Sequence, residues 1–198
     1  MTQSRISTAG RAIRQHAFIL IGVVGLLWFL ESADYLIWRG NLDWYGIFPR
    51  TRLGLRNIVI APFLHVGFSH LLANTLPFLI LGWFVLLRST RDFLSVFFTA
   101  AVVSGLGIWI FGTTNSVHIG MSGVIFGFLG FLMMRGALER SLASIALAAA
   151  ALFLYGGMLW GILPGQPGIS WLGHLFGFIG GGLAAYLLID RSEQPAAN

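Results

Sequence analysis

The sequence predicts an all-α, polytopic membrane protein that forms one bundle of six transmembrane helices. Of its 198 residues, 57% are hydrophobic and only 10% are charged, whereas a soluble domain carries about a quarter charged residues. The apolar residues gather in six runs, each approaching the roughly 20 residues needed to cross the hydrocarbon core. Short polar turns separate most of these runs, which favours a single membrane domain.

The six predicted spans lie within a membrane domain over residues 17–190, between a polar N-terminal segment (1–16) and a polar tail (191–198). The first run resembles a signal peptide, but it is long, lacks an obvious small-x-small cleavage site and is followed by further spans. In chain order the spans are residues 17–38, 66–87, 93–112, 121–135, 142–162 and 171–189.

The connections are unequal in length and composition. Residues 39–64 form a long segment rich in Arg, Trp, Tyr, Phe and Pro, a mixture that suits the membrane interface. Residues 88–92 and 135–141 are tight polar turns. Residues 113–119 form a short loop, and the composition of residues 164–168 predicts another.

The distribution of basic residues predicts the orientation. Six spans place both termini on one side, with eight arginines there (5, 11, 14, 88, 91, 135, 140 and 191) and four on the other (39, 50, 52 and 56). The positive-inside rule therefore predicts cytoplasmic termini in the cytoplasmic membrane. Because the arginines are scattered between apolar runs, a nucleic-acid partner is not expected.

Four polar residues are expected at one depth, near the outer face. The even-numbered spans start on that side, and they carry His70 and Asn74, then Ser122, then His174 near their beginnings. Polar groups in a bilayer usually face the bundle interior or a wet cavity. A shared depth therefore predicts one common site.

Two glycine ridges bring the serine and one histidine within reach of each other. Gly120, Gly123, Gly127 and Gly130 recur at i, i+3, i+7 and i+10, while His174, Gly177 and Gly181 lie at i, i+3 and i+7. Such side-chain-free faces let membrane helices approach closely. If the ridges pack together, Ser122 and His174 can meet.

This pair has the chemistry of an activated nucleophile. A serine hydroxyl becomes reactive when a positioned base, such as histidine, takes its proton. The helix start at Ser122 favours developing negative charge, and His70 and Asn74, at i and i+4, both donate hydrogen bonds as an oxyanion hole requires. The alternative roles are small-residue packing for Ser122, interhelical hydrogen bonding for His70 and Asn74, and a core position for His174.

Other polar residues are assigned structural roles. Glu31, Asp34 and Asp43 are expected to meet the arginines of the first loop. His65 is expected to hydrogen-bond within that loop, and His118 to lie in a loop at the water interface. No cysteine is present, which excludes disulfides and thiolate chemistry. No metal or cofactor is expected, and no HExxH motif occurs.

Three stretches resemble the signatures of the rhomboid family of bacterial intramembrane serine proteases: HVGFSHLLAN (65–74), GMSG (120–123) and GHLFG (173–177). The resemblance covers residues 17–190. It implies a six-helix rhomboid fold and hydrolysis of a peptide bond in or near the transmembrane segment of membrane-protein substrates.

The resemblance also implies individual roles. Ser122 would be the nucleophile and His174 the general base, with the oxyanion held by the Ser122 backbone N–H, His70 and Asn74. Gly120, Gly123, Phe126 and Gly177 would support the site. The first loop would insert partly into the outer leaflet, and residues 164–168 would cap the site.

The sequence departs from the family pattern at three places. Arg56-Asn57 stands where many bacterial rhomboids have Trp-Arg, Phe126 where a tyrosine is common, and Leu86 where an acidic residue is common. These departures concern loop packing and substrate gating rather than the serine–histidine pair.

Two alternative functions remain. One is an inactive rhomboid-like protein that binds transmembrane helices, although such proteins typically lose the serine or histidine. The other is a transporter or proton channel with a histidine relay, which would call for acidic residues at mid-bilayer and helices broken in repeated halves. The sequence leaves the substrate, the cleavage position and the oligomeric state open.

Overall fold

The computed structural model describes residues 2–189, and its long elements are all helices. The long helices are α1 (Thr2–Ala33), α3 (Gly67–Leu86), α4 (Thr90–Phe111), α5 (Ser122–Glu139), α6 (Leu142–Tyr155) and α7 (Trp171–Leu187). Shorter elements are the π-helical turn η1 (Asp34–Trp38), the 3₁₀ helices η2 (Asn41–Tyr45), η3 (Ala61–Phe63) and η4 (Gly156–Ile162), and α2 (Arg52–Asn57).

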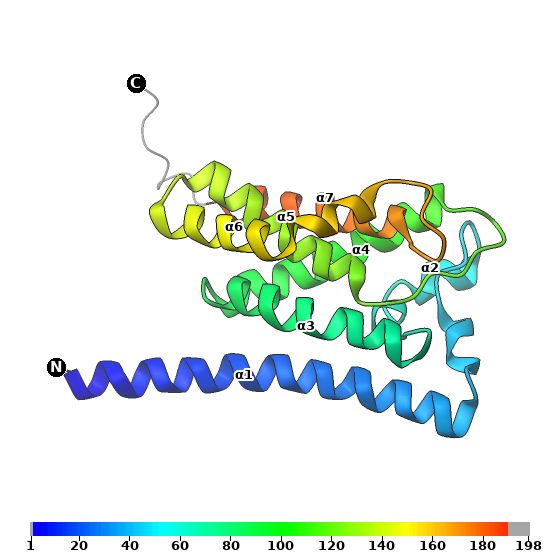
Figure 1. The fold of residues 1–198 in the computed structure, drawn as a ribbon, viewed down its shortest axis with the longest axis horizontal. Helices are drawn as coiled ribbons and strands as arrows, with labels where there is room; N and C mark the ends of the chain where they lie inside the picture. Colours follow the sequence, from blue (N-terminus) through cyan, green and yellow to red (C-terminus); the bar gives the residue numbers. More distant parts are fainter. Residues whose placement is uncertain (1, 190–198) are drawn as a thin grey trace.

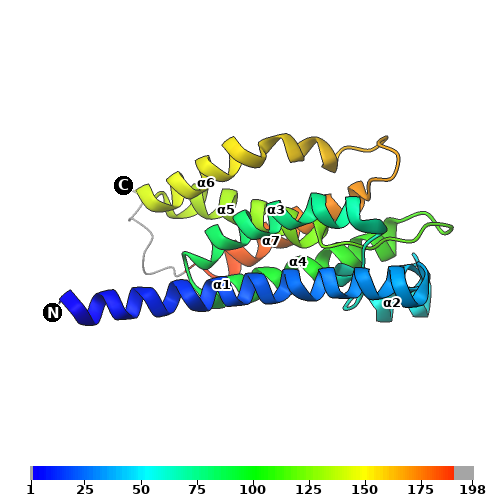
Figure 2. The same cartoon turned by 60° about the horizontal axis from the view of Figure 1, so that its bottom comes forward.

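The helices run back and forth along one direction (Figures 1 and 2). α1 lies along the edge of the bundle beside α3, while α4, α5 and α7 form its centre. We call one end of the bundle the turn end; it holds the start of α1 and the connections 87–89 and 140–141. The loop end holds residues 39–66, 112–121 and 163–170.

The prediction of an all-helical, multi-pass membrane protein is confirmed. Within residues 2–189, five helical segments are long and apolar enough to cross a membrane, and α7 adds a sixth apolar helix of 17 residues. Seventeen residues lie at the lower limit for a span. α7 is also rich in glycine and packs at the centre of the bundle, so little of its surface needs to face lipid.

Some boundaries differ from those predicted. α1 is helical from Thr2, so residues 2–16 of the predicted polar segment continue the first span as helix; the arginines there do not prevent this, because arginine is a good helix former. α6 ends at Tyr155, and the predicted fifth span continues as the 3₁₀ helix η4, which begins with Gly156-Gly157. The tail 191–198 lies outside the described residues.

The first loop is more ordered than a plain interfacial segment. α2 begins after Thr51, whose Oγ1 accepts the Gly54 N–H at 2.9 Å, a standard N-cap. Asn57 Nδ2 donates to the Gly46 carbonyl at 3.1 Å. Asn57 thus fastens the loop at the place where the sequence departs from the Trp-Arg pair of the resembled family.

The two glycine faces meet between α5 and α7. A Cβ on Gly177 would overlap the carbonyl oxygen of Gly123, and one on Gly181 would overlap that of Gly127. Glycine at these positions therefore allows backbone-to-backbone contact between the helices. Gly120 does not belong to the ridge as predicted: it precedes α5, in a turn with φ +117°.

Candidate active site

The close contact of α5 and α7 joins Ser122 to His174. Ser122 is the first residue of α5, and His174 lies in the first turn of α7. Ser122 Oγ is 2.8 Å from His174 Nε2, and both side chains are half-buried. The structure thus brings together two residues that are 52 positions apart in the chain.

A backbone carbonyl fixes the tautomer of His174. Its Nδ1 is 3.0 Å from the carbonyl oxygen of Gly161 in η4. Because a carbonyl can only accept, Nδ1 carries the proton and Nε2 is left as an acceptor for the Ser122 hydroxyl. This is the orienting contact that a carboxylate supplies in a serine–histidine–aspartate triad.

Two neighbours hold the imidazole from its sides. The Phe126 ring stacks on it, with centroids 4.2 Å apart and planes inclined by 10°. A Cβ on Gly161 would lie 3.1 Å from His174 Nδ1 and 3.2 Å from the Phe126 ring. A glycine at 161 therefore leaves room for the ring, and Phe126 supplies the stacking face.

His70 and Asn74 lie on α3, and His70 lies beside the turn that leads to Ser122. His70 Nδ1 accepts the Val66 N–H at 3.4 Å, which leaves the proton on Nε2. That edge of the ring faces Gly120, since a Cβ there would lie 2.7 Å from His70 Cε1 and 3.0 Å from Nε2. His70 thus presents an N–H donor next to the GMSG turn.

The amide of Asn74 is bonded within its own helix. Asn74 is 4% exposed, and its Nδ2 donates to the His70 carbonyl at 2.9 Å. The second Nδ2 hydrogen and the side-chain oxygen remain for other partners. The hydrogen bonds found among residues 2–189 join neither His70 nor Asn74 to Ser122.

His65 anchors the same turn. Its Nε2 accepts the backbone N–H of Met121 at 3.4 Å, and the Gly120 N–H donates to the Ala61 carbonyl at 2.9 Å. The bond from His65 Nε2 therefore crosses from the first loop to the start of α5, where helix N–H groups lack intrahelical partners. Burial, together with neighbouring His70, lowers the pKa of His65 to about 3, so the ring is neutral.

Among residues 2–189, the outer carboxylates have structural contacts but do not pair with the first-loop arginines as expected. Glu31, Asp34 and Asp43 line a common cavity with His65, and Asp34 Oδ1 accepts the Leu42 N–H at 3.0 Å. No ion pair in that part of the chain joins them to the arginines of the first loop. Burial, with the nearby charge of Asp34, raises the pKa of Asp43.

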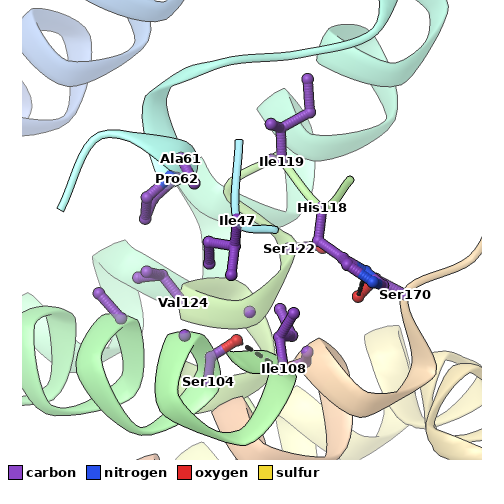
Figure 3. Close-up of a pocket in the computed structure, with 15 residues that line it drawn as sticks. Ile47, Ala61, Pro62, Ser104, Ile108, His118, Ile119, Ser122, Val124 and Ser170 are labelled. Carbon is purple, nitrogen blue, oxygen red and sulfur yellow. Dashed lines mark hydrogen bonds between the residues drawn. The ribbon is translucent and has the colours of Figure 1, made fainter. Parts of the chain in front are cut away.

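A small cavity of about 30 Å³ lies against Ser122. Figure 3 shows Ser104, His118, Ser122 and Ser170 among its lining residues. This is enough space for a water molecule, and the lining offers it hydroxyl partners. Across residues 2–189, no group of three or more His, Cys, Asp or Glu side chains is arranged to hold a metal ion.

His118 is more enclosed than a residue of a water-exposed loop. It is half-buried, and both of its ring nitrogens have hydroxyl partners. Leu86, where the resembled family often has an acidic residue, is fully buried among apolar residues. A leucine side chain needs no charged partner in this apolar surrounding.

Fold and site together define a multi-pass membrane protein with a serine–histidine pair between two glycine-packed helices. Comparison with known proteins gives the family. The model of the Rhomboid domain matches residues 52–191, and the chain belongs to the rhomboid family.

Relatives occur in bacteria. An uncharacterized protein of Mycobacterium tuberculosis is 40% identical over 186 residues, covering 90% of this chain and 77% of the relative. One from Mycobacterium leprae is 39% identical, covering 90% and 73%. A Bacillus subtilis protein named "Putative rhomboid protease YdcA" is 28% identical over 188 residues, covering 88% and 87%.

The role of Gly161 was not predicted from the sequence. A backbone carbonyl can come from any residue type, so the group that orients His174 leaves no signature in the sequence. The one available signal was a cluster of three glycines, 156, 157 and 161, at the end of the fifth predicted span.

Proposed function

We propose that the protein is an intramembrane serine endopeptidase that cleaves membrane-protein substrates in or near a transmembrane segment. The observation that carries the proposal is the 2.8 Å contact between Ser122 Oγ and His174 Nε2, with Nδ1 held by Gly161. Membership of the rhomboid family supports it.

The reaction follows from this geometry. His174 Nε2 takes the hydroxyl proton as Ser122 Oγ attacks the scissile carbonyl, and the ring then returns the proton to the leaving amine. Phe126 and Gly161 keep the imidazole in place as it becomes charged. Water then enters and hydrolyses the acyl-enzyme by the same steps.

The oxyanion formed in each step needs donors. The backbone N–H of Ser122 lies at the start of α5, where the helix dipole favours negative charge. The Nε2–H of His70 and the second Nδ2 hydrogen of Asn74 are the side-chain donors that we assign to the oxyanion.

A reactive-serine assay tests this assignment. A fluorophosphonate probe should label the wild-type protein in detergent, and Ser122→Ala should remove the label while the protein still unfolds at the wild-type temperature. A wild-type protein that is neither labelled nor active on a model transmembrane substrate would instead favour the inactive, helix-binding alternative.

Substrates should carry helix-breaking residues near the site of cleavage. The carbonyls of a transmembrane helix are hydrogen-bonded within the helix, so Ser122 reaches them only after local unwinding. Gly, Pro or polar residues lower that cost. Replacing them by leucine in one model substrate should slow cleavage, and equal rates would reject the unwinding argument.

We further propose that the loop end faces outward and that both termini are cytoplasmic. The asymmetry of the arginines supports this orientation. The chain contains no cysteine, so thiol labelling of a variant with one engineered cysteine shows on which side of the membrane that position lies. Asn115→Cys should react with a membrane-impermeant maleimide on intact cells, whereas Ala137→Cys at the turn end should react only after lysis; the reverse pattern would overturn the orientation.

A further inference from the structure

A second serine–histidine hydrogen bond lies next to the first. His118 Nδ1 is 2.7 Å from Ser170 Oγ. His118 precedes Ser122 by four residues, and Ser170 precedes His174 by four, so the same two segments of chain are joined twice. Figure 3 shows His118 and Ser170 in contact at the rim of the cavity that Ser122 also lines.

The protons of this second pair can be assigned from its neighbours. Ser116 Oγ donates its hydrogen to the Thr113 carbonyl at 2.7 Å, so it must accept from His118 Nε2 at 2.8 Å. Nε2 therefore carries the ring proton, and Nδ1 accepts the Ser170 hydroxyl. Every polar atom of the neutral ring is then satisfied.

His118 joins three segments of the loop end. Its backbone pairs with Ile47 of the first loop through two bonds, of 2.9 and 3.2 Å. Its ring holds the 113–116 turn on one side and Ser170 on the other. The Ser170 carbonyl in turn accepts the His174 N–H at 3.0 Å, so Ser170 belongs to the first turn of α7.

The bond between His118 and Ser170 complements the glycine contact. On the side of the dyad toward the middle of the bundle, Gly123 and Gly177 set the spacing of α5 and α7. On the loop side, the chain on either flank of the dyad is irregular, and the His118–Ser170 bond is a side-chain hydrogen bond between the two flanks. This bond therefore links the starts of α5 and α7 on the side opposite the glycine contact.

We propose that His118 is a positioning residue that, through Ser170, holds the starts of α5 and α7 at the spacing that the Ser122–His174 contact requires. This inference rests on the proposed protease function. His118 has no contact with the reacting atoms. Burial lowers its pKa, which keeps the ring in the neutral form that accepts the Ser170 hydroxyl.

The test compares the reactivity of Ser122 in matched variants. His118→Ala and Ser170→Ala each remove one partner, Ser170→Thr keeps the hydroxyl, and His16→Ala removes a half-buried histidine at the turn end, where it packs on Trp83. Each variant is measured for its fluorophosphonate labelling rate, for kcat and KM on a model transmembrane substrate, and for its unfolding temperature in detergent.

We expect His118→Ala and Ser170→Ala to lower the labelling rate and kcat by about 10- to 100-fold, because small displacements of a reacting pair cost rate steeply. KM should change little, since substrate binding is not the step affected. Ser170→Thr should recover most of the rate, and His16→Ala should match the wild type. The double variant should lose no more than either single one.

Other outcomes overturn the inference. Wild-type labelling in both alanine variants would show that the bond does not position the dyad. A rate loss in Ser170→Ala that appears only together with a lowered unfolding temperature, and that Ser170→Thr does not reverse, would show a general role in folding. If His118→Ala does not fold, the labelling rate and kcat of Ser170→Ala decide whether the bond positions the dyad. An unlabelled wild type would instead refute the protease function itself.

Discussion

The two ends of the bundle are held by different kinds of interaction. At the turn end, Arg88 pairs with Asp92 at 3.3 Å and with Glu139 at 2.6 Å, and Glu139 also pairs with Arg135. Ser144 bonds to Arg88 at 2.9 Å and to Glu139, which ties the start of α6 into the same network. This network of paired charges and one serine joins α4, α5 and α6 to the turn that follows α3.

At the loop end the contacts around the dyad are neutral. Ser122, His174, His118 and Ser170 bond to one another and to backbone carbonyls. A full charge beside His174 would shift the proton equilibrium on which general-base catalysis depends. Within residues 2–189, the ion pairs described here lie at the end opposite the candidate chemistry, so stability and reactivity should respond to different mutations.

Turnover and stability should separate most clearly in a pair of variants, one at the loop end and one at the turn end. Ser122→Ala should abolish cleavage, since loss of a serine nucleophile costs about 10⁶-fold in kcat, and it should leave unfolding unchanged. Ser144→Ala, at the turn end, should cost about 1 kcal/mol of stability and keep kcat. Turnover assays and detergent unfolding measure both; substantial turnover by Ser122→Ala would refute the assignment.

Asn74→Ala should affect turnover more than binding. An oxyanion donor acts on the transition state, and one donor is typically worth about 10²- to 10³-fold in kcat. The measurement is a full kcat and KM determination on a model substrate. A raised KM with unchanged kcat would make Asn74 a structural residue, in keeping with its bond to the His70 carbonyl.

Gly177→Leu should lower stability and turnover together, and so should not separate the two ends of the bundle. The new side chain would overlap the Gly123 backbone, so α7 must move away from α5. We expect a loss of about 3 kcal/mol and about 100-fold lower turnover from the displaced dyad. Gly25→Leu, on α1, meets open space and is the matched control; equal activity in the two variants would show that the glycine contact does not set the dyad.

The sequence contained enough to predict the helices and the contact between Ser122 and His174. Hydropathy located the spans because every apolar helix must match the bilayer, and glycine spacing located the α5–α7 contact because only residues without side chains let backbones touch. Both are properties of residue type and spacing, which a sequence displays directly.

What escaped prediction depends on backbone atoms and on side-chain direction. The Gly161 carbonyl that orients His174 has no signature in residue type. The carboxylates of Asp34 and Asp43 turn toward backbone and a shared cavity instead of toward Arg39 or Arg52, and composition does not encode that choice. His118 was placed correctly in a loop, but its bond to Ser170 depends on how two loops pack.

The smallest expected effect on turnover comes from the turn end. Glu139→Gln keeps the shape of the side chain but removes the charge that pairs with Arg88 and Arg135. The side chain of Glu139 is 16% exposed, so solvent screens the pairs only in part, and we expect a loss of about 2 kcal/mol.

Glu139→Gln should lower stability without lowering the reactivity of Ser122. Arg88 and Arg135 would keep like charges close together without a bridging carboxylate, so the variant should unfold at a lower detergent concentration or temperature than the wild type. The dyad lies at the other end of α5, and its contacts are neutral hydrogen bonds that do not involve Glu139. The labelling rate of Ser122, measured below the unfolding transition, should therefore stay at the wild-type value. A labelling rate that falls in proportion to stability would show that the two ends are coupled along α5, and that ion pairing and reactivity are not separated in this fold.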